Sequence, residues 1–158
     1  MTPIGARGRA VYPEPRTTRE LTPDWGRRNV AQSIDDGEEA VGVGQNLFCA
    51  GEVRGVARWF RTPADVVSAV GDDLTGVIAF VFQGGMTFLS PILSEVSGVV
   101  CTTGSLESHL AMLAREFEMP CVMAARLDVV VSDGDTIVLH LAGGEARITR
   151  DTRLKALF

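Results

Sequence analysis

The chain has 158 residues, of which 46% are hydrophobic and 22% charged, and its formal net charge is −5 at pH 7. This length suits one domain with a real core and leaves room for a short extension. No basic block is interleaved with aromatic residues, which argues against nucleic-acid binding. No apolar run is long enough to span a bilayer, and the N-terminal residues lack the apolar core of a signal peptide, so we expect a cytoplasmic protein.

The three cysteines, Cys49, Cys101 and Cys121, are far apart in the sequence and include no C-x-x-C pair. This spacing fits neither a disulfide framework nor a zinc site. We therefore expect them to be small buried side chains of a cytosolic protein, and we expect no metal site in this chain.

The first 40 residues differ in composition from the rest. Four of the seven prolines lie within residues 1–28, and an acidic run occupies residues 35–39. Weak apolar periodicity favours a mobile extension; the alternative is an arm that docks on a partner or a neighbouring subunit. We predict a compact domain over residues 41–150 and a C-terminal tail over residues 151–158.

The compact domain is expected to begin with two strands, at 46–50 and 53–60. A helix follows from Thr62 to residue 70, because threonine can cap a helix, proline suits its first position and an aspartate lies in its first turn. The remaining predicted elements are a buried strand at 77–82, a short helix at 90–96, a strand at 99–101, a helix at 108–117, a strand at 121–124 and a hairpin of 136–142 with 145–148. Strands that alternate with helices predict an α/β fold with a mixed sheet and helical crossovers.

The segment from Thr103 to His109 is the most informative part of the chain. It is a turn of small residues that opens a helix whose apolar side chains recur at helical spacing. Ser105 or Ser108 can cap this helix, and with either cap His109 lies in the first turn. The unpaired N–H groups and the helix dipole at that end favour a neutral, nucleophilic imidazole and attract anions.

His109 is therefore the candidate catalytic residue, since histidine can form a covalent intermediate with a phosphoryl group. The residues expected to bind the phosphate are Thr103, Gly104, Ser105 and Ser108. Glu107 is a candidate modulator, because its carboxylate repels phosphate unless it points away or holds the imidazole by a hydrogen bond. The alternative is that His109 is an incidental polar residue at a helix start.

The other histidine of the chain is His140. It lies on the face of its predicted strand opposite Ile137, Leu139 and Leu141, which are apolar and expected to be buried. We therefore expect His140 to have a surface or edge role and no role in catalysis.

The histidine segment resembles the phosphohistidine motif of phosphoenolpyruvate-utilising enzymes such as pyruvate phosphate dikinase and phosphoenolpyruvate synthase. That motif runs G-G-x-T-S-H, then small and aliphatic residues, A-R-E and I-P-A-V. Here Gly104–His109 is followed by Leu110–Glu116 and Met119–Val122. Similar segments in the same order extend the resemblance from about Val41 to Ile148.

The resemblance implies a swivelling β/β/α phosphohistidine domain as a stand-alone subunit, with His109 as the phosphorylated residue. The implied function is that of a carrier in a multi-subunit, dikinase-type phosphotransferase. It would move a phosphoryl group from an ATP-grasp-type subunit or domain to a small organic acceptor, such as a phenol, bound by another subunit. ATP and Mg²⁺ are implied at the partner, and no cofactor is expected in this chain, which has no phosphate-binding P-loop.

The sequence departs from the family pattern at several positions. Ser105 replaces a glycine, Glu107 a small or apolar residue, Leu110 a small residue and Cys101 a common threonine. The change at Glu107 favours an alternative in which the domain has lost transfer chemistry and acts as a regulatory or structural partner. Another alternative is a protein that binds a small anion directly at the helix N-terminus.

Overall fold

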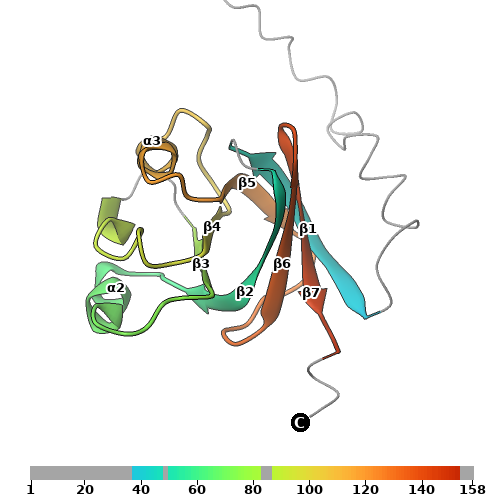
Figure 1. The fold of residues 1–158 in the computed structure, drawn as a ribbon, viewed down its shortest axis with the longest axis horizontal. Coiled ribbons are helices and arrows are strands. Elements are labelled where there is room, and N and C mark those ends of the chain that lie inside the picture. The colour runs from blue at the N-terminus through green and yellow to red at the C-terminus, as the bar shows by residue number, and fades with distance from the viewer. Residues whose placement is uncertain (1–36, 48–49, 83–86, 154–158) are drawn as a thin grey trace, which may run out of the picture. The chain divides into compact units, whose positions relative to one another are not determined.

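The computed structural model describes residues 37–47, 50–82 and 87–153, which contain seven strands. The strands are β1 (Glu38–Asn46), β2 (Gly51–Trp59), β3 (Val77–Val81), β4 (Gly98–Cys101), β5 (Cys121–Leu127), β6 (Thr136–Ala142) and β7 (Glu145–Asp151). They close into one barrel in the order β1-β5-β4-β3-β2-β6-β7 (Figure 1). The described part also contains the α-helices α2 (Pro63–Ala69) and α3 (His109–Glu116) and the short 3₁₀ helix η1 (Thr87–Leu89).

Four neighbouring strands of the barrel run in the same direction. Strand β3 pairs in parallel with β2 and β4, and β4 pairs in parallel with β5. The pairs β2–β6, β6–β7, β7–β1 and β1–β5 are antiparallel. The carboxyl ends of β2, β3, β4 and β5 therefore meet at one end of the barrel.

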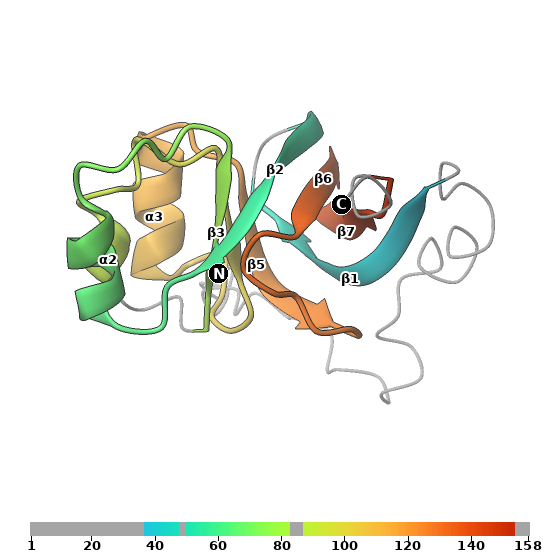
Figure 2. The ribbon, with the colours of Figure 1, turned by 90° about the horizontal axis from the view of Figure 1, so that it is seen from below.

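The described residues bury two apolar cores. One fills the barrel and includes Ile78, Phe80, Val100, Leu139 and Ile148. The other lies between the outer face of the parallel strands and the helices, which both pack on that side (Figure 2). Alternate residues of β3 and β4 contribute to the two cores, which explains why these strands have continuous apolar sequences.

The predicted fold class, an α/β swivelling β/β/α phosphohistidine domain with a mixed sheet and helical crossovers, is wrong. More of the described residues lie in strands than in helices, the sheet closes into a seven-stranded barrel, and α2 and α3 are short. The error originates in β1, whose first residues were assigned to the N-terminal extension and whose residues 41–45 were assigned to no strand. Because β1 pairs with both β5 and β7, it joins the two edges that an open sheet would have.

Several predicted boundaries also change. Of the strand predicted at 46–50, Asn46 is the last residue of β1, Leu47 and Ala50 are in no strand, and residues 48–49 lie outside the described part. Residues 90–96 form turns in place of the predicted helix. Strand β5 continues to Leu127, past the predicted end at Ala124, whose φ of 49° accompanies a register shift in the β1–β5 pairing.

The helix predicted from Thr62 is confirmed, with the expected cap. The side chain of Thr62 accepts a hydrogen bond from the backbone N–H of Asp65, and the carboxylate of Asp65 accepts one from the backbone N–H of Thr62 at 2.8 Å. Pro63 occupies the first helical position. Local capping signals therefore suffice to locate the start of α2.

The predicted domain limits fall near the ends of the described chain. Residues 1–36 of the predicted extension and residues 154–158 of the predicted tail lie outside the described part. Strand β1 begins at Glu38 and β7 ends at Asp151. Neither helix in the described ranges is both long and apolar enough to span a membrane.

Strand β1 closes the barrel where a glycine lies against the backbone of β5. A Cβ atom at Gly42 would be 2.2 Å from the carbonyl oxygen of Arg126 and 3.0 Å from the Cα atom of Leu127. Backbone atoms cannot rotate away as a flexible side chain would, so a larger residue must separate the two strands. Glycine at position 42 is therefore a requirement of closure.

We predict that Gly42→Ala lowers the free energy of unfolding by about 1–3 kcal/mol, because the added methyl group overlaps β5. Urea unfolding followed by circular dichroism measures the change. Gly144→Ala is the matched control, since a Cβ atom there meets no atom within 4 Å. A Gly42→Ala variant as stable as Gly144→Ala would contradict this account of closure.

Candidate active site

The loop between β4 and α3 is fastened to the end of β3. The hydroxyl groups of Thr102 and Thr103 both donate to the carbonyl oxygen of Phe82, the former at 3.3 Å. The thiol of Cys101 donates to the carbonyl oxygen of Thr103 at 2.9 Å. Gly104 then turns the chain with a φ of +92°, a conformation in which side chains are strained.

Ser108 is the cap of helix α3, which resolves the choice between Ser105 and Ser108. Its side-chain oxygen accepts the backbone N–H of Ala111 at 3.2 Å, and its carbonyl oxygen accepts that of Met112 at 3.1 Å. Its own N–H donates to the carbonyl oxygen of Ser105 at 3.0 Å. The turn from Ser105 to Ser108 and the start of the helix thus form one hydrogen-bonded unit.

His109 is the first residue of α3, and its side chain is exposed. The next two residues, Leu110 and Ala111, are fully buried and anchor the helix against the second core. The described part of the chain provides no acceptor for the backbone N–H groups of His109 and Leu110. An exposed imidazole therefore lies beside two unpaired donors at the positive end of the helix dipole.

The predicted phosphate-binding hydroxyl groups differ in whether their O–H hydrogen is available for a hydrogen bond to a phosphate. Thr103 already gives its hydrogen to the carbonyl oxygen of Phe82. Ser105 and Ser108 act as acceptors, from the N–H groups of Glu107 and Ala111, so each retains its own O–H hydrogen for an anion.

Glu107 is exposed, and within the described residues its carboxylate takes part in no hydrogen bond or ion pair. Its backbone N–H donates to the side-chain oxygen of Ser105 at 3.3 Å. The carboxylate therefore neither holds the imidazole of His109 nor makes the hydrogen bonds that a bound phosphate would make at this turn.

Two of the three cysteines have the predicted environment. Cys101 and Cys121 are buried, whereas Cys49 lies outside the described residues. Burial raises the pKa of the Cys101 thiol, and the hydrogen bond to Thr103 only partly offsets this effect. The thiol nearest the His109 loop is thus protonated near neutral pH and a poor nucleophile.

His140 lies away from this loop, in a polar cluster that joins three strands. Its Nε2 atom is 3.1 Å from both the carboxylate of Glu38 on β1 and the hydroxyl of Thr149 on β7. Burial raises the pKa of Glu38, but the hydrogen bonds from Thr149 and His140 outweigh it, so the pKa is lowered overall. Through these contacts His140, on β6, connects β1 with β7.

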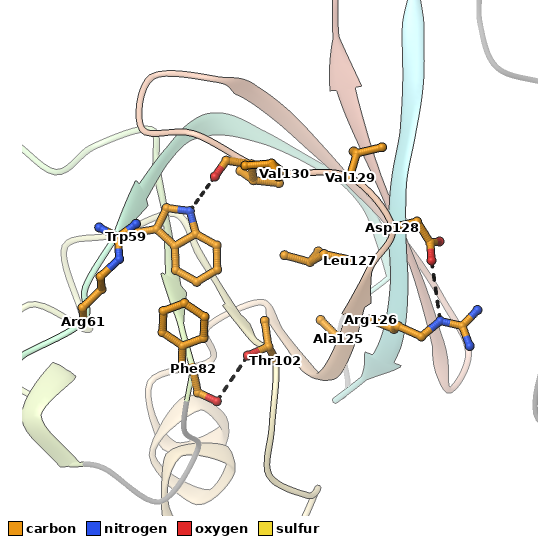
Figure 3. Close-up of a pocket in the computed structure, with 11 residues that line it drawn as sticks. Trp59, Arg61, Phe82, Thr102, Ala125, Arg126, Leu127, Asp128, Val129 and Val130 are labelled. Atoms are coloured by element: carbon orange, nitrogen blue, oxygen red, sulfur yellow. Dashed lines mark hydrogen bonds and ion pairs between the residues drawn. The ribbon is translucent and has the colours of Figure 1, made fainter.

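Sequence reasoning missed a cleft at the carboxyl ends of the parallel strands. Its volume is about 550 Å³, and its walls include Trp59, Phe82, Leu127 and Val130 (Figure 3). The signal available in the sequence was an aromatic residue at the end of β2 and another just after β3. Nothing local in the sequence indicates that these rings meet.

Comparison with known proteins gives one sequence-family match. The model of the family described as PEP-utilising enzyme, mobile domain, matches residues 81–144, which is less than half of the chain and includes His109. A search of curated protein sequences found no match.

Solved structures of similar fold belong to other proteins. Muramoyltetrapeptide carboxypeptidase from Oxalobacter formigenes matches with a TM-score of 0.50 and 12% identity, over 84% of this chain and 57% of that one. An MccF-like protein from Bacillus anthracis str. Ames matches with a TM-score of 0.51 and 14% identity, over 68% of this chain and 42% of that one. At these identities the likeness shows the fold alone, and this chain spans only part of the length of either protein.

These comparisons correct the resemblance inferred from the sequence. The identification of residues 41–148 as a stand-alone swivelling phosphohistidine domain is wrong, because the similar folds are those of a carboxypeptidase and an MccF-like protein and the sheet is a closed barrel. The match over residues 81–144 gives weak support for a phosphohistidine-type segment and suggests a phosphotransferase family.

We predict that Ser108→Ala lowers the free energy of unfolding by about 1 kcal/mol, because the N–H of Ala111 loses its acceptor at the start of α3. Chemical denaturation measures the difference. Ser94→Ala, at an exposed turn position, is the control and should change stability by less than about 0.5 kcal/mol. Equal effects of the two substitutions would mean that Ser108 is not the effective cap.

Proposed function

We propose that His109 accepts a phosphoryl group and that the chain carries it from an ATP-binding partner to a small organic acceptor held by another partner. The observation that carries this proposal is the exposed imidazole at the first position of α3, within the segment that matches the mobile-domain family. In this proposal ATP and Mg²⁺ belong to the partner, and this chain contributes the nucleophile.

The proposed transfer has two steps. A ring nitrogen of neutral His109 attacks the phosphorus of the donor; an N–P bond forms, and the P–O bond to the leaving group breaks with its electron pair on oxygen. A hydroxyl oxygen of the acceptor then attacks the same phosphorus. The N–P bond breaks, its electron pair returns to the imidazole, and the hydroxyl proton passes to solvent.

The surroundings of His109 support an anionic phosphoryl group. The N–H groups of His109 and Leu110 remain available, and the hydroxyl groups of Ser105 and Ser108 each have a hydrogen to donate. The positive end of the helix dipole lowers the energy of negative charge at this position. Exposure of the imidazole allows two partners to reach it in turn.

In this proposal the charge of Glu107 affects the rate at which His109 is phosphorylated. Its carboxylate is exposed and leaves the turn free for a phosphate, which favours transfer over the alternative of a domain that has lost its chemistry. It still adds a negative charge two residues before His109, and this charge repels the incoming phosphoryl group at low ionic strength. Glu107→Gln should therefore be phosphorylated at least as fast as the wild type.

The test uses the full chain, Mg²⁺ and a desalted extract of the cells that produce it, with ATP labelled with ³²P at the β or the γ position in separate reactions. We expect label that is stable in alkali and lost in acid on the wild type and on His140→Asn, and none on His109→Asn. Label that persists on His109→Asn would overturn the residue assignment. An unlabelled wild type in an extract that consumes the ATP would overturn the carrier function.

A further inference from the structure

The cleft at the carboxyl ends of the parallel strands is separate from His109 and has its own chemistry. Its volume of about 550 Å³ lies in the range of pockets that hold small molecules. It is bounded by residues from the ends of β2, β3 and β5 and from the loop that follows β5 (Figure 3).

Apolar side chains face water in this cleft. Phe82 is 49% exposed and Val130 is 82% exposed. The ring of Phe82 stacks on that of Trp59, with centroids 4.7 Å apart and an interplanar angle of 25°. Leu127 points toward the two rings from the opposite wall (Figure 3). A third ring can extend this stack at a favourable distance.

Trp59 is held in place by the protein, because both of its N–H groups donate to protein acceptors. Its indole N–H donates to the carbonyl oxygen of Val131 at 2.8 Å, and its backbone N–H donates to the carboxylate of Asp133 at 2.7 Å. The ring therefore offers a ligand only its apolar surface and needs no rearrangement to do so.

One arginine at the cleft, Arg61, forms no ion pair within the described residues. The guanidinium of Arg61 lies 5.6 Å from the centre of the Trp59 ring, and no carboxylate in the described ranges lies within ion-pair distance of it. The carboxylate of Asp65 accepts a hydrogen bond from the backbone N–H of Arg61, and the positive charge of Arg61 also helps to lower the pKa of Asp65. The second arginine of the cleft, Arg126, pairs with Asp128 at 3.7 Å.

We propose that this cleft binds a small planar aromatic anion. The ring stacks against Phe82 and packs against Leu127, and the anionic group lies toward Arg61. An aliphatic ring of the same size lacks the flat face that stacking requires, and a neutral aromatic compound lacks the negative charge that would pair with Arg61. The proposal does not depend on phosphorylation of His109.

The test follows the indole N–H signal of Trp59 by ¹⁵N NMR in the Trp25→Phe background, where Trp59 is the single tryptophan. Benzoate, benzyl alcohol and cyclohexanecarboxylate are titrated separately. We expect a saturable shift with benzoate and dissociation constants about three- to tenfold higher for the other two compounds. Equal constants for benzoate and cyclohexanecarboxylate, or no saturable shift with any probe, would overturn the proposal.

Two variants locate the site in the same background. Phe82→Leu should abolish the preference for benzoate over cyclohexanecarboxylate. Arg61→Gln should abolish the preference for benzoate over benzyl alcohol. Val67→Ala, on the exposed side of α2 and outside the cleft, should leave both preferences unchanged. If both ligand preferences remain in the two cleft variants, and their backbone NMR spectra are native, benzoate binds at another site.

Discussion

Pairing of β1 with both β5 and β7 is the constraint on which the rest of the structure depends. It turns a sheet with two open edges into a barrel, and it requires glycine where β1 crosses the backbone of Arg126. Closure of the barrel determines the position of β5, and the parallel pairing of β5 with β4 determines the position of β4. The carboxyl end of β4 leads directly into the loop before α3. The position of His109 is therefore a consequence of contacts made far from it in the sequence.

Phe82 connects the two functional features proposed for this chain. Its carbonyl oxygen accepts the hydroxyl groups of Thr102 and Thr103, which hold the loop that leads to His109. Its ring forms a wall of the cleft and stacks on Trp59. Because the two features use the backbone and the side chain of one residue, Phe82→Leu can alter the cleft while the hydrogen bonds of the loop remain.

The sequence predicted the local features and failed on the long-range ones. The starts of α2 and α3 were predictable because capping residues and apolar spacing lie within a few positions of each helix end. Strand β1 was missed because its partners are 76 to 113 residues away, and closure has no local signal. The cleft was missed for the same reason, since Trp59, Phe82 and Leu127 meet only when the strands pair.

The most direct measurement uses phosphoramidate, a small phosphoryl donor. The rate at which it phosphorylates each histidine is measured in the folded chain and in the same chain unfolded in urea, by mass spectrometry under alkaline conditions. If the start of α3 prepares His109 for phosphoryl transfer, His109 reacts faster in the folded chain than in the unfolded one. His140, held by Glu38 and Thr149, reacts more slowly when folded. A His109 that reacts no faster in the folded chain would contradict the proposed role of the helix start.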